Sequence, residues 1–196
     1  MELKTLAIVQ ARLGSTRFPK KVLKRIGGKS VIEILFHRLS LSKKIDKILL
    51  ATGDDAKNSL LSDTIKDLGY DVFKGSESNV LDRFYNAAKL FSPKIIVRIT
   101  GDCPLIDPKI VDRVIELYEE SDVDYSSNVE PPTFPDGLDV EVFSFDALQK
   151  SFELATSKYD YEHVTTFIRS NNQFKRENFA SEYNYSNERW TIDEPE

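Results

Sequence analysis

The feature that most constrains the fold is the alternation of short apolar runs with helical stripes over residues 1–120. Four runs have the length and composition of buried strands: Leu6–Val9, Ile48–Thr52, Asp71–Phe73 and Ile95–Ile99. Between and after them, apolar residues recur at helical spacing, and Asn79 and Asp107 stand where helix N-caps belong. Strands that alternate with crossover helices form a mostly parallel sheet with helices on both faces. The pattern therefore predicts an α/β protein.

The first strand leads into a small loop rich in cations. After Val9, the loop contains Arg12, Gly14, Ser15, Thr16, Arg17, Lys20 and Lys21. Ligands of parallel sheets bind beyond the carboxyl ends of the strands. Small residues let backbone N–H groups approach a phosphate, and fixed cations offset its charge. The loop thus predicts a polyphosphate site, with a solvated basic loop as the alternative.

Two aspartates are candidates for holding a metal ion beside such a phosphate. Asp102 follows the strand Ile95–Ile99 and is expected at the same edge of the sheet as the basic loop. Mg²⁺ prefers one or two carboxylates together with phosphates and waters. Asp193 closes an expected short strand, Trp190–Ile192, and would supply the second carboxylate. The alternative for each is an aspartate that caps a turn.

The character of the chain changes after residue 121. A proline-rich turn segment occupies residues 130–137, and the run Leu138–Phe143 then alternates apolar and acidic residues. This alternation predicts a half-buried strand that presents Asp139 and Glu141 together. A helix is expected around Glu162–Arg169, with His163 near its start in either a structural or a functional role. Cys103 is expected to be a small buried residue, because no histidine stands near it in the sequence to activate the thiol.

Composition excludes several classes of protein. The 196 residues are 40% hydrophobic and 30% charged, as in globular proteins, and the net charge of -5 argues against a nucleic-acid partner. The sequence lacks the run of about 18 apolar residues that a membrane span requires. The single cysteine excludes an internal disulfide and fits a reducing compartment. Together with an N-terminus that enters a strand without a signal peptide, this predicts a cytoplasmic protein.

Motifs along essentially the whole chain resemble the sugar-nucleotide cytidylyltransferases. The segments concerned are Gln10–Lys21, Phe73–Glu77, Val80–Tyr85, Val97–Pro108, Phe134–Phe143, Glu162–Thr165 and Arg189–Glu196. That family includes the synthetases that activate 3-deoxy-manno-octulosonate and N-acylneuraminate with CTP, and the chain is most similar to its branch of spore coat polysaccharide biosynthesis protein F-like members. The resemblance implies a three-layer α/β sandwich with a mostly parallel central sheet, the GT-A-like fold of nucleotidyltransferases and many glycosyltransferases. It also implies one nucleotidyltransferase domain over residues 1–196, with a nucleotide-binding half (1–120) and a sugar-binding or dimerising part (121–196).

The resemblance also implies roles for individual residues. The residues expected to bind the nucleotide are Gln10, Ala11, Arg12, Gly14, Ser15, Lys21, Arg83 and Thr100. Within that set Arg12 and Lys21 match the phosphate-binding positions, and these two with Asp102 are the expected catalytic residues. Asp102 and Asp193 match the carboxylates that bind Mg²⁺. The residues expected near the sugar are Asp136, Asp139, Glu141 and His163.

This sequence departs from the family's pattern at two places. Lys20 stands where the family usually has a glycine, in Phe18-Pro-Lys-Lys21 instead of Leu-Pro-Gly-Lys. The substitution is expected to alter the conformation of the loop or to add a phosphate contact. The chain also stops at Glu196, within the Asp-Glu-Pro-Glu-Asp motif, where the family continues into a further helix. The resemblance therefore implies a truncated chain with a weakened metal site.

The expected reaction joins CMP from CTP to an acidic sugar of the 2-keto-3-deoxy type and releases pyrophosphate, in the synthesis of cell-surface or spore-coat polysaccharide. Mg²⁺ is the expected cofactor, and a homodimer is the expected assembly. Two alternatives stand beside it: a glycosyltransferase that uses a nucleotide-sugar donor, and a non-catalytic nucleotide-binding or partner-binding domain.

Overall fold

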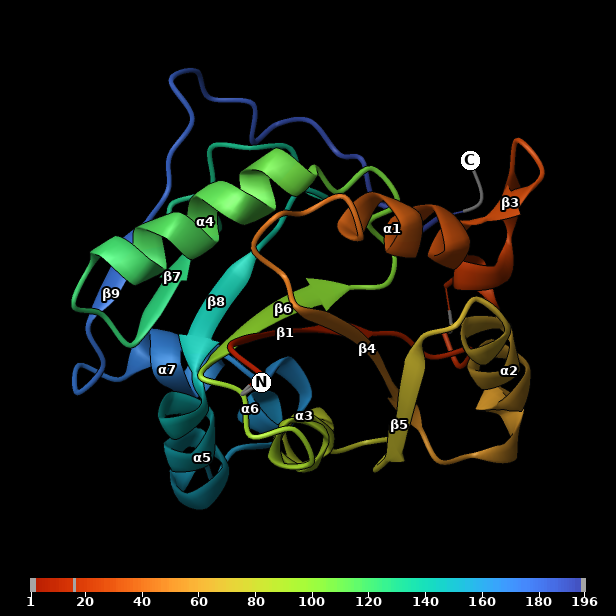
Figure 1. Cartoon of the computed structure of the whole chain (residues 1–196), viewed down its shortest axis with the longest axis horizontal. Helices are drawn as coiled ribbons and strands as arrows, with labels where there is room; N and C mark the ends of the chain where they lie inside the picture. The colour runs from red at the N-terminus through yellow and green to blue at the C-terminus, as the bar shows by residue number, and fades with distance from the viewer. Residues whose placement is uncertain (1–2, 16, 195–196) are drawn as a thin grey trace.

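The computed structural model describes residues 3–15 and 17–194, and a seven-stranded sheet lies at its centre (Figure 1). In spatial order the strands are β5 (Asp71–Gly75), β4 (Lys47–Gly53), β1 (Thr5–Gln10), β6 (Ile95–Thr100), β8 (Glu141–Ser144), β7 (Tyr125–Ser127) and β9 (Arg176–Asn178). The first four run parallel to one another, whereas β8 is antiparallel to both of its neighbours. A separate hairpin joins β2 (Arg25–Ile26) and β3 (Lys29–Ser30). The mostly parallel sheet predicted from the sequence is confirmed.

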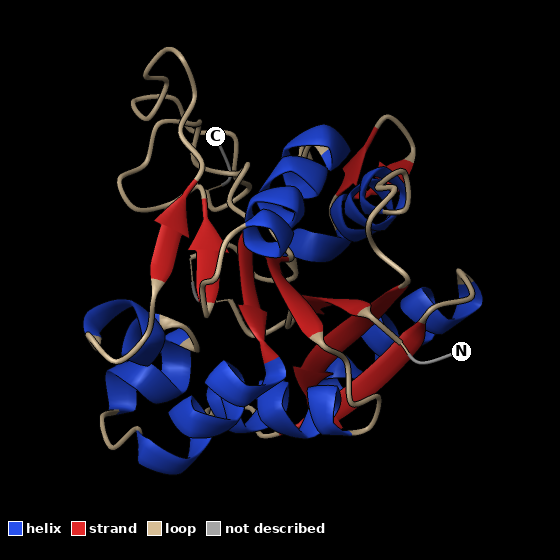
Figure 2. Ribbon diagram, turned by 60° about the vertical axis from the view of Figure 1, so that its left-hand side comes forward, coloured by secondary structure: helices blue, strands red, loops and turns tan. Residues whose placement is uncertain are grey.

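Helices cover both faces of this sheet, which gives the three layers seen in Figures 1 and 2. One face packs against α1 (Val31–Leu39), α2 (Ser59–Asp67) and α4 (Pro108–Glu120). The other packs against α3 (Val80–Lys89), α5 (Phe145–Leu154), α6 (Lys158–His163) and α7 (Thr166–Ser170). Two 3₁₀ turns, η1 (Lys21–Leu23) and η2 (Ala56–Asn58), complete the described elements. Strand β1 contributes alternate residues to the two apolar cores, so it reads as a continuous apolar run.

The predicted helix caps are confirmed. The side chain of Asn79 accepts a hydrogen bond from the backbone N–H of Asp82 at 2.9 Å, at the start of α3. Asp107 accepts one from the N–H of Lys109 at 2.7 Å, and Pro108 is the first residue of α4. Each cap satisfies an N–H that would otherwise lack a partner at the helix start. The two helices therefore begin at positions fixed relative to the strands before them.

The register of the sheet places two functional loops side by side. Gln10, the last residue of β1, pairs with Thr100, the last residue of β6, so the loops that follow leave the sheet at one level. The N–H of Gly101 donates to the Gln10 carbonyl at 2.8 Å. A Cβ atom at position 101 would lie 2.6 Å from the Cβ of Ala11. Glycine is required there by the close approach of the two loops.

Two predicted strands and one predicted helix differ from the structure, and the second strand, Trp190–Ile192, is described below. Strand β8 begins at Glu141 instead of Leu138, after a turn at Gly137, and Glu141 is buried instead of sharing an exposed face with Asp139. The expected helix over Glu162–Arg169 is broken by Val164, whose φ is 61°, so His163 ends α6 and does not begin a helix.

The expected strand Trp190–Ile192 is an extended segment without regular pairing. Its neighbour Arg189 forms an isolated bridge with Asp136, because the segment lies along the loop before β8 instead of along the sheet. Among residues 3–15 and 17–194, no helix combines the length and the apolar composition that crossing a bilayer requires.

Candidate active site

A cavity of about 210 Å³ opens at the carboxyl ends of β1 and β6. Its lining consists of Gln10, Ala11, Arg12, Ser15, Lys21, Val22, Val80, Arg83, Thr100, Gly101, Asp102 and Glu162. All of the predicted nucleotide-binding residues line it except Gly14. The register of β1 and β6 brings the loops after these strands together, and β5, which runs parallel to them, leads to the start of α3 at the same edge of the sheet.

Lys21 connects the basic loop to both predicted metal-binding carboxylates. Its Nζ lies 2.6 Å from Oδ2 of Asp102 and 2.6 Å from Oδ1 of Asp193. Burial alone would lower the pKa of Lys21, but the hydrogen bonds and charges of the two aspartates raise it above its ordinary value. Asp193 is buried as well, yet Lys21 and Arg189 hold its pKa at about 2. The Lys21 ammonium group and the Asp193 carboxylate are therefore both charged at neutral pH.

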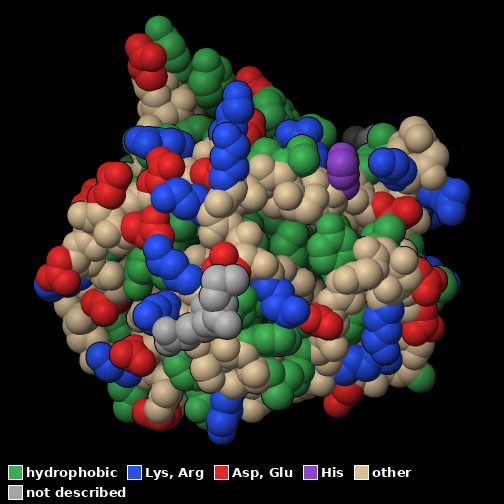
Figure 3. Space-filling view, viewed as in Figure 1, with side chains coloured by type: hydrophobic (Ala, Val, Ile, Leu, Met, Phe, Trp, Pro, Cys, Tyr) green, Lys and Arg blue, Asp and Glu red, His purple; other side chains and the backbone are tan. Residues whose placement is uncertain are grey.

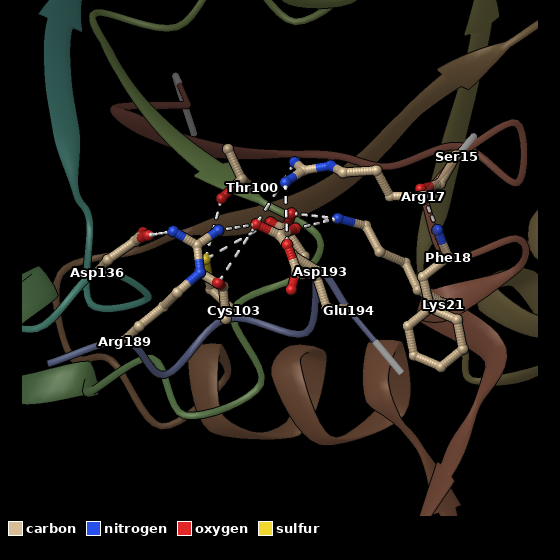
Figure 4. A network of polar contacts seen from close by, with 12 residues as sticks. Ser15, Arg17, Phe18, Lys21, Thr100, Cys103, Asp136, Arg189, Asp193 and Glu194 are labelled. Atoms are coloured by element: carbon tan, nitrogen blue, oxygen red, sulfur yellow. Dashed lines mark hydrogen bonds and ion pairs between the residues drawn. The ribbon is translucent and has the colours of Figure 1, made fainter. Parts of the chain in front are cut away.

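A backbone contact explains how the distant Asp193 reaches this site. The N–H of Ile192 donates to the carbonyl of Asp102 at 2.9 Å, so the two aspartates lie side by side although they are far apart in the sequence. Arg189 contacts Asp193 from the other side and lies 2.7 Å from Oδ2 of Asp136. Arg17 lies 3.7 Å from Asp193 (Figure 4). Asp193 thus has cations on three sides.

The backbone of the first loop explains the family's glycine at position 20. Lys20 has φ 57°, in the left-handed region, at the turn that begins η1. Glycine enters this region without steric cost, whereas a residue with a Cβ atom is strained there. The Lys20 side chain is exposed and does not line the cavity. Thr16 lies outside the described residues.

Two buried polar atoms in the cavity wall lack hydrogen-bond partners among the described residues: Oε1 of Gln10 and Nε of Arg83. Arg83 is 1% exposed, and burial lowers the pKa of its guanidinium to about 10. Its NH1 donates to the Ser76 carbonyl at 2.6 Å. Buried polar groups without partners are costly, so their presence together marks a place for a polar ligand.

The four predicted sugar-binding residues have different surroundings. Asp136 pairs with Arg189, at the edge of the carboxylate site. Burial and the charges of Asp136 and Glu141 raise the pKa of Asp139 to about 6. His163 is exposed, packs against Tyr159 with ring centroids 4.3 Å apart, and is absent from the cavity lining.

Glu141 lies in the interior of the sheet. Its carboxylate forms an ion pair with Arg98 and accepts hydrogen bonds from Tyr125 at 2.8 Å and Thr165 at 2.6 Å. Burial opposes ionisation, but these partners lower the pKa of Glu141 below its ordinary value. Glu141 on β8 and Arg98 on β6 therefore form an ion pair that links the two strands.

Sequence reasoning missed Glu162, which lines the nucleotide cavity although its neighbour His163 does not. The sequence held a signal for it, because the two residues belong to the same motif. Only the structure distinguishes them, because Glu162 alone of the two contributes to the lining.

The donor set fits a magnesium ion shared with phosphate. Among the residues that the structure describes, no group of three or more His, Cys, Asp or Glu side chains is arranged to hold a metal alone. Asp102 and Asp193 instead hold the ammonium group of Lys21 between them. Mg²⁺ characteristically takes one or two carboxylates and completes its shell with phosphates and waters. Asp102 and Asp193 therefore fit a magnesium site whose remaining ligands a bound nucleotide and waters would supply.

Comparison with known proteins agrees with this geometry. The spore coat polysaccharide biosynthesis protein SpsF of Bacillus subtilis is 35% identical over 179 residues, covering 89% of this chain and 73% of the relative. The 8-amino-3,8-dideoxy-manno-octulosonate cytidylyltransferase of Shewanella frigidimarina is 34% identical over 122 residues, or 60% of this chain and 48% of the relative. A solved cytidylyltransferase from Leptospira borgpetersenii matches with a TM-score of 0.92 and 33% identity, over 97% of this chain and 82% of that one.

The fold is thus that of an α/β nucleotidyltransferase. The family model described as cytidylyltransferase matches residues 6–194, and the chain belongs to the cytidylyltransferase family.

Proposed function

We propose that this chain transfers CMP from CTP to an acidic sugar and releases pyrophosphate. The observation on which this depends is the single cavity that joins the cations Arg12 and Lys21 to the carboxylate of Asp102. A triphosphate needs the cations, and a metal ion that bridges its oxygens needs the carboxylate. Membership of the cytidylyltransferase family supports CTP as the donor, and the relative from Shewanella supports an acidic sugar as the acceptor.

The reaction is a displacement at the α-phosphorus of CTP. A sugar hydroxyl oxygen forms a new bond to that phosphorus, the bond to the bridging oxygen of the β-phosphate breaks, and the hydroxyl proton passes to a nearby base. Such chemistry consists mainly of positioning and charge stabilisation. Arg12 and Lys21 stabilise the charge that develops on the departing pyrophosphate, and the raised pKa of Lys21 keeps it cationic.

Asp102 and Asp193 would hold a magnesium ion, which would supply additional charge stabilisation at the phosphates. Because Lys21 contacts both carboxylates here, its ammonium group would move toward the phosphates as they arrive. The side chain is a flexible four-carbon stem, which permits such a movement.

The unpartnered atoms of the cavity wall suit the nucleoside. Gln10 and Arg83 offer an acceptor and donors toward the base, with Ala11 and Thr100 beside them. The backbone at Ser15, with Gly14 next to it in the loop, would approach the phosphates. Asp136 and Asp139 would accept hydrogen bonds from sugar hydroxyls. The proposed subcellular location is the cytoplasm, where a free cysteine stays reduced.

A homodimer is the proposed assembly. An apolar hollow of about 290 Å³ lies between residues 134–138 and 181–190, and Tyr185 and Trp190 beside it are 44% and 39% exposed. Exposed apolar patches of this kind favour association between chains. Sedimentation equilibrium over a range of concentrations tests this proposal, and a constant monomer mass contradicts it.

The central test is release of pyrophosphate from CTP with a panel of 2-keto-3-deoxy sugar acids, with and without Mg²⁺. Lys21→Ala is expected to lower turnover by about 100-fold or more, as for other groups that stabilise transition-state charge, and to affect folding far less. Lys24→Ala is the matched control, because Lys24 is exposed and lies outside the cavity. Equal turnover in Lys21→Ala and the wild type would refute the role of the loop. No release of pyrophosphate from CTP, together with sugar transfer from an added nucleotide-sugar donor, would indicate a glycosyltransferase.

A further inference from the structure

A buried asparagine joins the phosphate loop to two other segments. Asn58, at the end of η2, is fully buried, and its Oδ1 accepts a hydrogen bond from the N–H of Leu13 at 2.9 Å. Its Nδ2 donates to the Gly53 carbonyl at 3.2 Å and to Oε2 of Glu77 at 2.9 Å. One side chain thus connects the loop after β1, the end of β4 and the segment before α3, and every polar group of its amide is used.

Glu77 extends this arrangement to the cations of the site. Its Oε1 lies 3.4 Å from NH1 of Arg12 and 3.1 Å from Nζ of Lys57. The carboxylate packs directly on Gly53, where a Cβ atom would lie 1.6 Å from Oε2. The Glu77 carboxylate therefore packs on the backbone of Gly53. One of its oxygens accepts a hydrogen bond from Asn58, and the other faces Arg12.

We propose that Asn58 and Glu77 form a clamp that positions the phosphate loop and Arg12 for the triphosphate. This inference rests on the proposed function, because it assigns Arg12 to the phosphates of CTP. Neither residue lines the nucleotide cavity, so both act through the groups that they hold. Asn58 fixes the backbone of the loop through Leu13, and Glu77 fixes the guanidinium through an ion pair.

The clamp explains why Arg12 can be useful although its side chain is 43% exposed. An exposed arginine loses much rotamer freedom when a ligand immobilises it, and this loss weakens binding. A carboxylate that already restricts the guanidinium reduces the loss. The restriction of Arg12 depends on the charge of Glu77, whereas the hydrogen bond from Asn58 needs only an acceptor at position 77.

The test compares Glu77→Ala with Glu77→Gln in the full chain, using the CTP-dependent release of pyrophosphate. Glu77→Ala is expected to raise KM for CTP about tenfold, with a smaller change in kcat, because misplacement of Arg12 weakens nucleotide binding. Glu77→Gln can still accept the hydrogen bond from Asn58 but loses the charge that holds Arg12, so it is expected to raise KM as Glu77→Ala does while leaving Leu13 in place. Asp63→Ala removes an exposed carboxylate from the neighbouring helix α2 and is the matched control.

A second readout needs neither nucleotide nor turnover. Hydrogen exchange at the Leu13 amide, followed by NMR, is expected to accelerate about tenfold in Glu77→Ala while the amides of β1 keep their protection. Asn58→Asp places a second carboxylate beside that of Glu77 in a buried position. The double variant Asn58→Asp with Glu77→Gln restores a donor–acceptor pair, because the amide at position 77 can donate to the carboxylate at position 58. The double variant is expected to recover part of the Leu13 protection that Asn58→Asp loses.

Wild-type KM and wild-type Leu13 exchange in Glu77→Ala would overturn the proposal. Leu13 exchange that accelerates equally in Glu77→Gln and Glu77→Ala would also overturn it, because the position of Asn58 would then not depend on an acceptor at residue 77. If the wild type binds no CTP, the proposed function fails, whereas exchange at Leu13 still decides whether the clamp exists.

Discussion

At the scale of single residues, the fold imposes an unfavourable backbone conformation on Lys20 and disfavours the ionised form of Asp139. Lys20 adopts a left-handed backbone conformation with a side chain that makes the conformation costly. Asp139 is a largely buried carboxylate, and burial together with the charges of Asp136 and Glu141 raises its pKa to about 6. Strain of this kind persists where the surrounding structure enforces it, and it is common near functional sites.

Replacing Lys20 with glycine is expected to stabilise the protein by about 0.5 kcal/mol, because relief of the left-handed strain exceeds the added entropy of the unfolded chain. Urea unfolding measures the difference. Lys24→Gly is the matched control, since Lys24 has an ordinary φ of -63° and glycine is expected to destabilise there. A loss of stability in Lys20→Gly would show that the turn is not strained.

Asp139→Asn is expected to raise the free energy of unfolding at pH 7.5 by about 2 kcal/mol, because ionisation of Asp139 is unfavourable in the folded state. The folded pKa of about 6 lies above the ordinary value of 3.8, so this cost grows as pH rises between them and vanishes below. Unfolding at pH 7.5 and at pH 4 should therefore show a gain that disappears in acid. A gain that is equal at both pH values would contradict this explanation.

At the scale of elements, the ion pair of Arg98 and Glu141 joins the parallel part of the sheet to its antiparallel edge. Arg98 and Glu141 face each other in the register of β6 and β8. Glu141 is 4% exposed and has Tyr125 and Thr165 as further partners. A buried pair adds little over apolar residues of the same shape, but loss of one partner leaves the other charge without compensation.

Glu141→Gln is thus expected to lower the free energy of unfolding by about 3 kcal/mol, because Arg98 would stay buried without its counter-charge. Thermal and urea unfolding measure the loss. Glu116→Gln on α4 breaks the exposed pair with Arg113 and is expected to cost less than about 0.5 kcal/mol. Equal effects of the two substitutions would refute the structural role of Glu141.

At the scale of the whole molecule, local charge and net charge have opposite signs. The chain carries a net charge of -5, yet its nucleotide cavity is bordered by Arg12, Lys21 and Arg83. On the face in Figure 3, basic side chains lie interspersed with acidic ones instead of forming a continuous patch. A broad nucleic-acid surface would need such a patch, whereas one nucleotide needs only a few cations in a cavity.

CTP with Mg²⁺ is expected to raise the melting temperature by about 5 °C or more at 100 times Kd, because binding to the folded state adds about 2.7 kcal/mol. A thermal-shift panel of the four triphosphates, with and without Mg²⁺, measures this. Asp102→Asn is expected to abolish the part that depends on Mg²⁺ and to leave part of the CTP effect. Equal shifts with all four triphosphates would contradict base selection by Gln10 and Arg83.

Much of this architecture was predictable because it depends on local patterns. Alternating strands and helical stripes determine a parallel sheet, and parallel strands bring the loops after β1 and β6 to one edge. The cations of the first loop and Asp102 therefore fell at the same edge by topology alone. The caps at Asn79 and Asp107 were likewise visible, since each cap is a contact between neighbours in the sequence.

The sequence by itself determined the layers, the edge of the sheet and the residue types of the basic loop. The tertiary structure decided where each side chain points and what it meets: Lys21 between Asp102 and Asp193, Glu141 inside the sheet, and Asn58 beneath the phosphate loop. The reason is physical. Periodicity follows from the backbone, whereas the charge state and partners of a side chain depend on burial and on segments far away in the sequence.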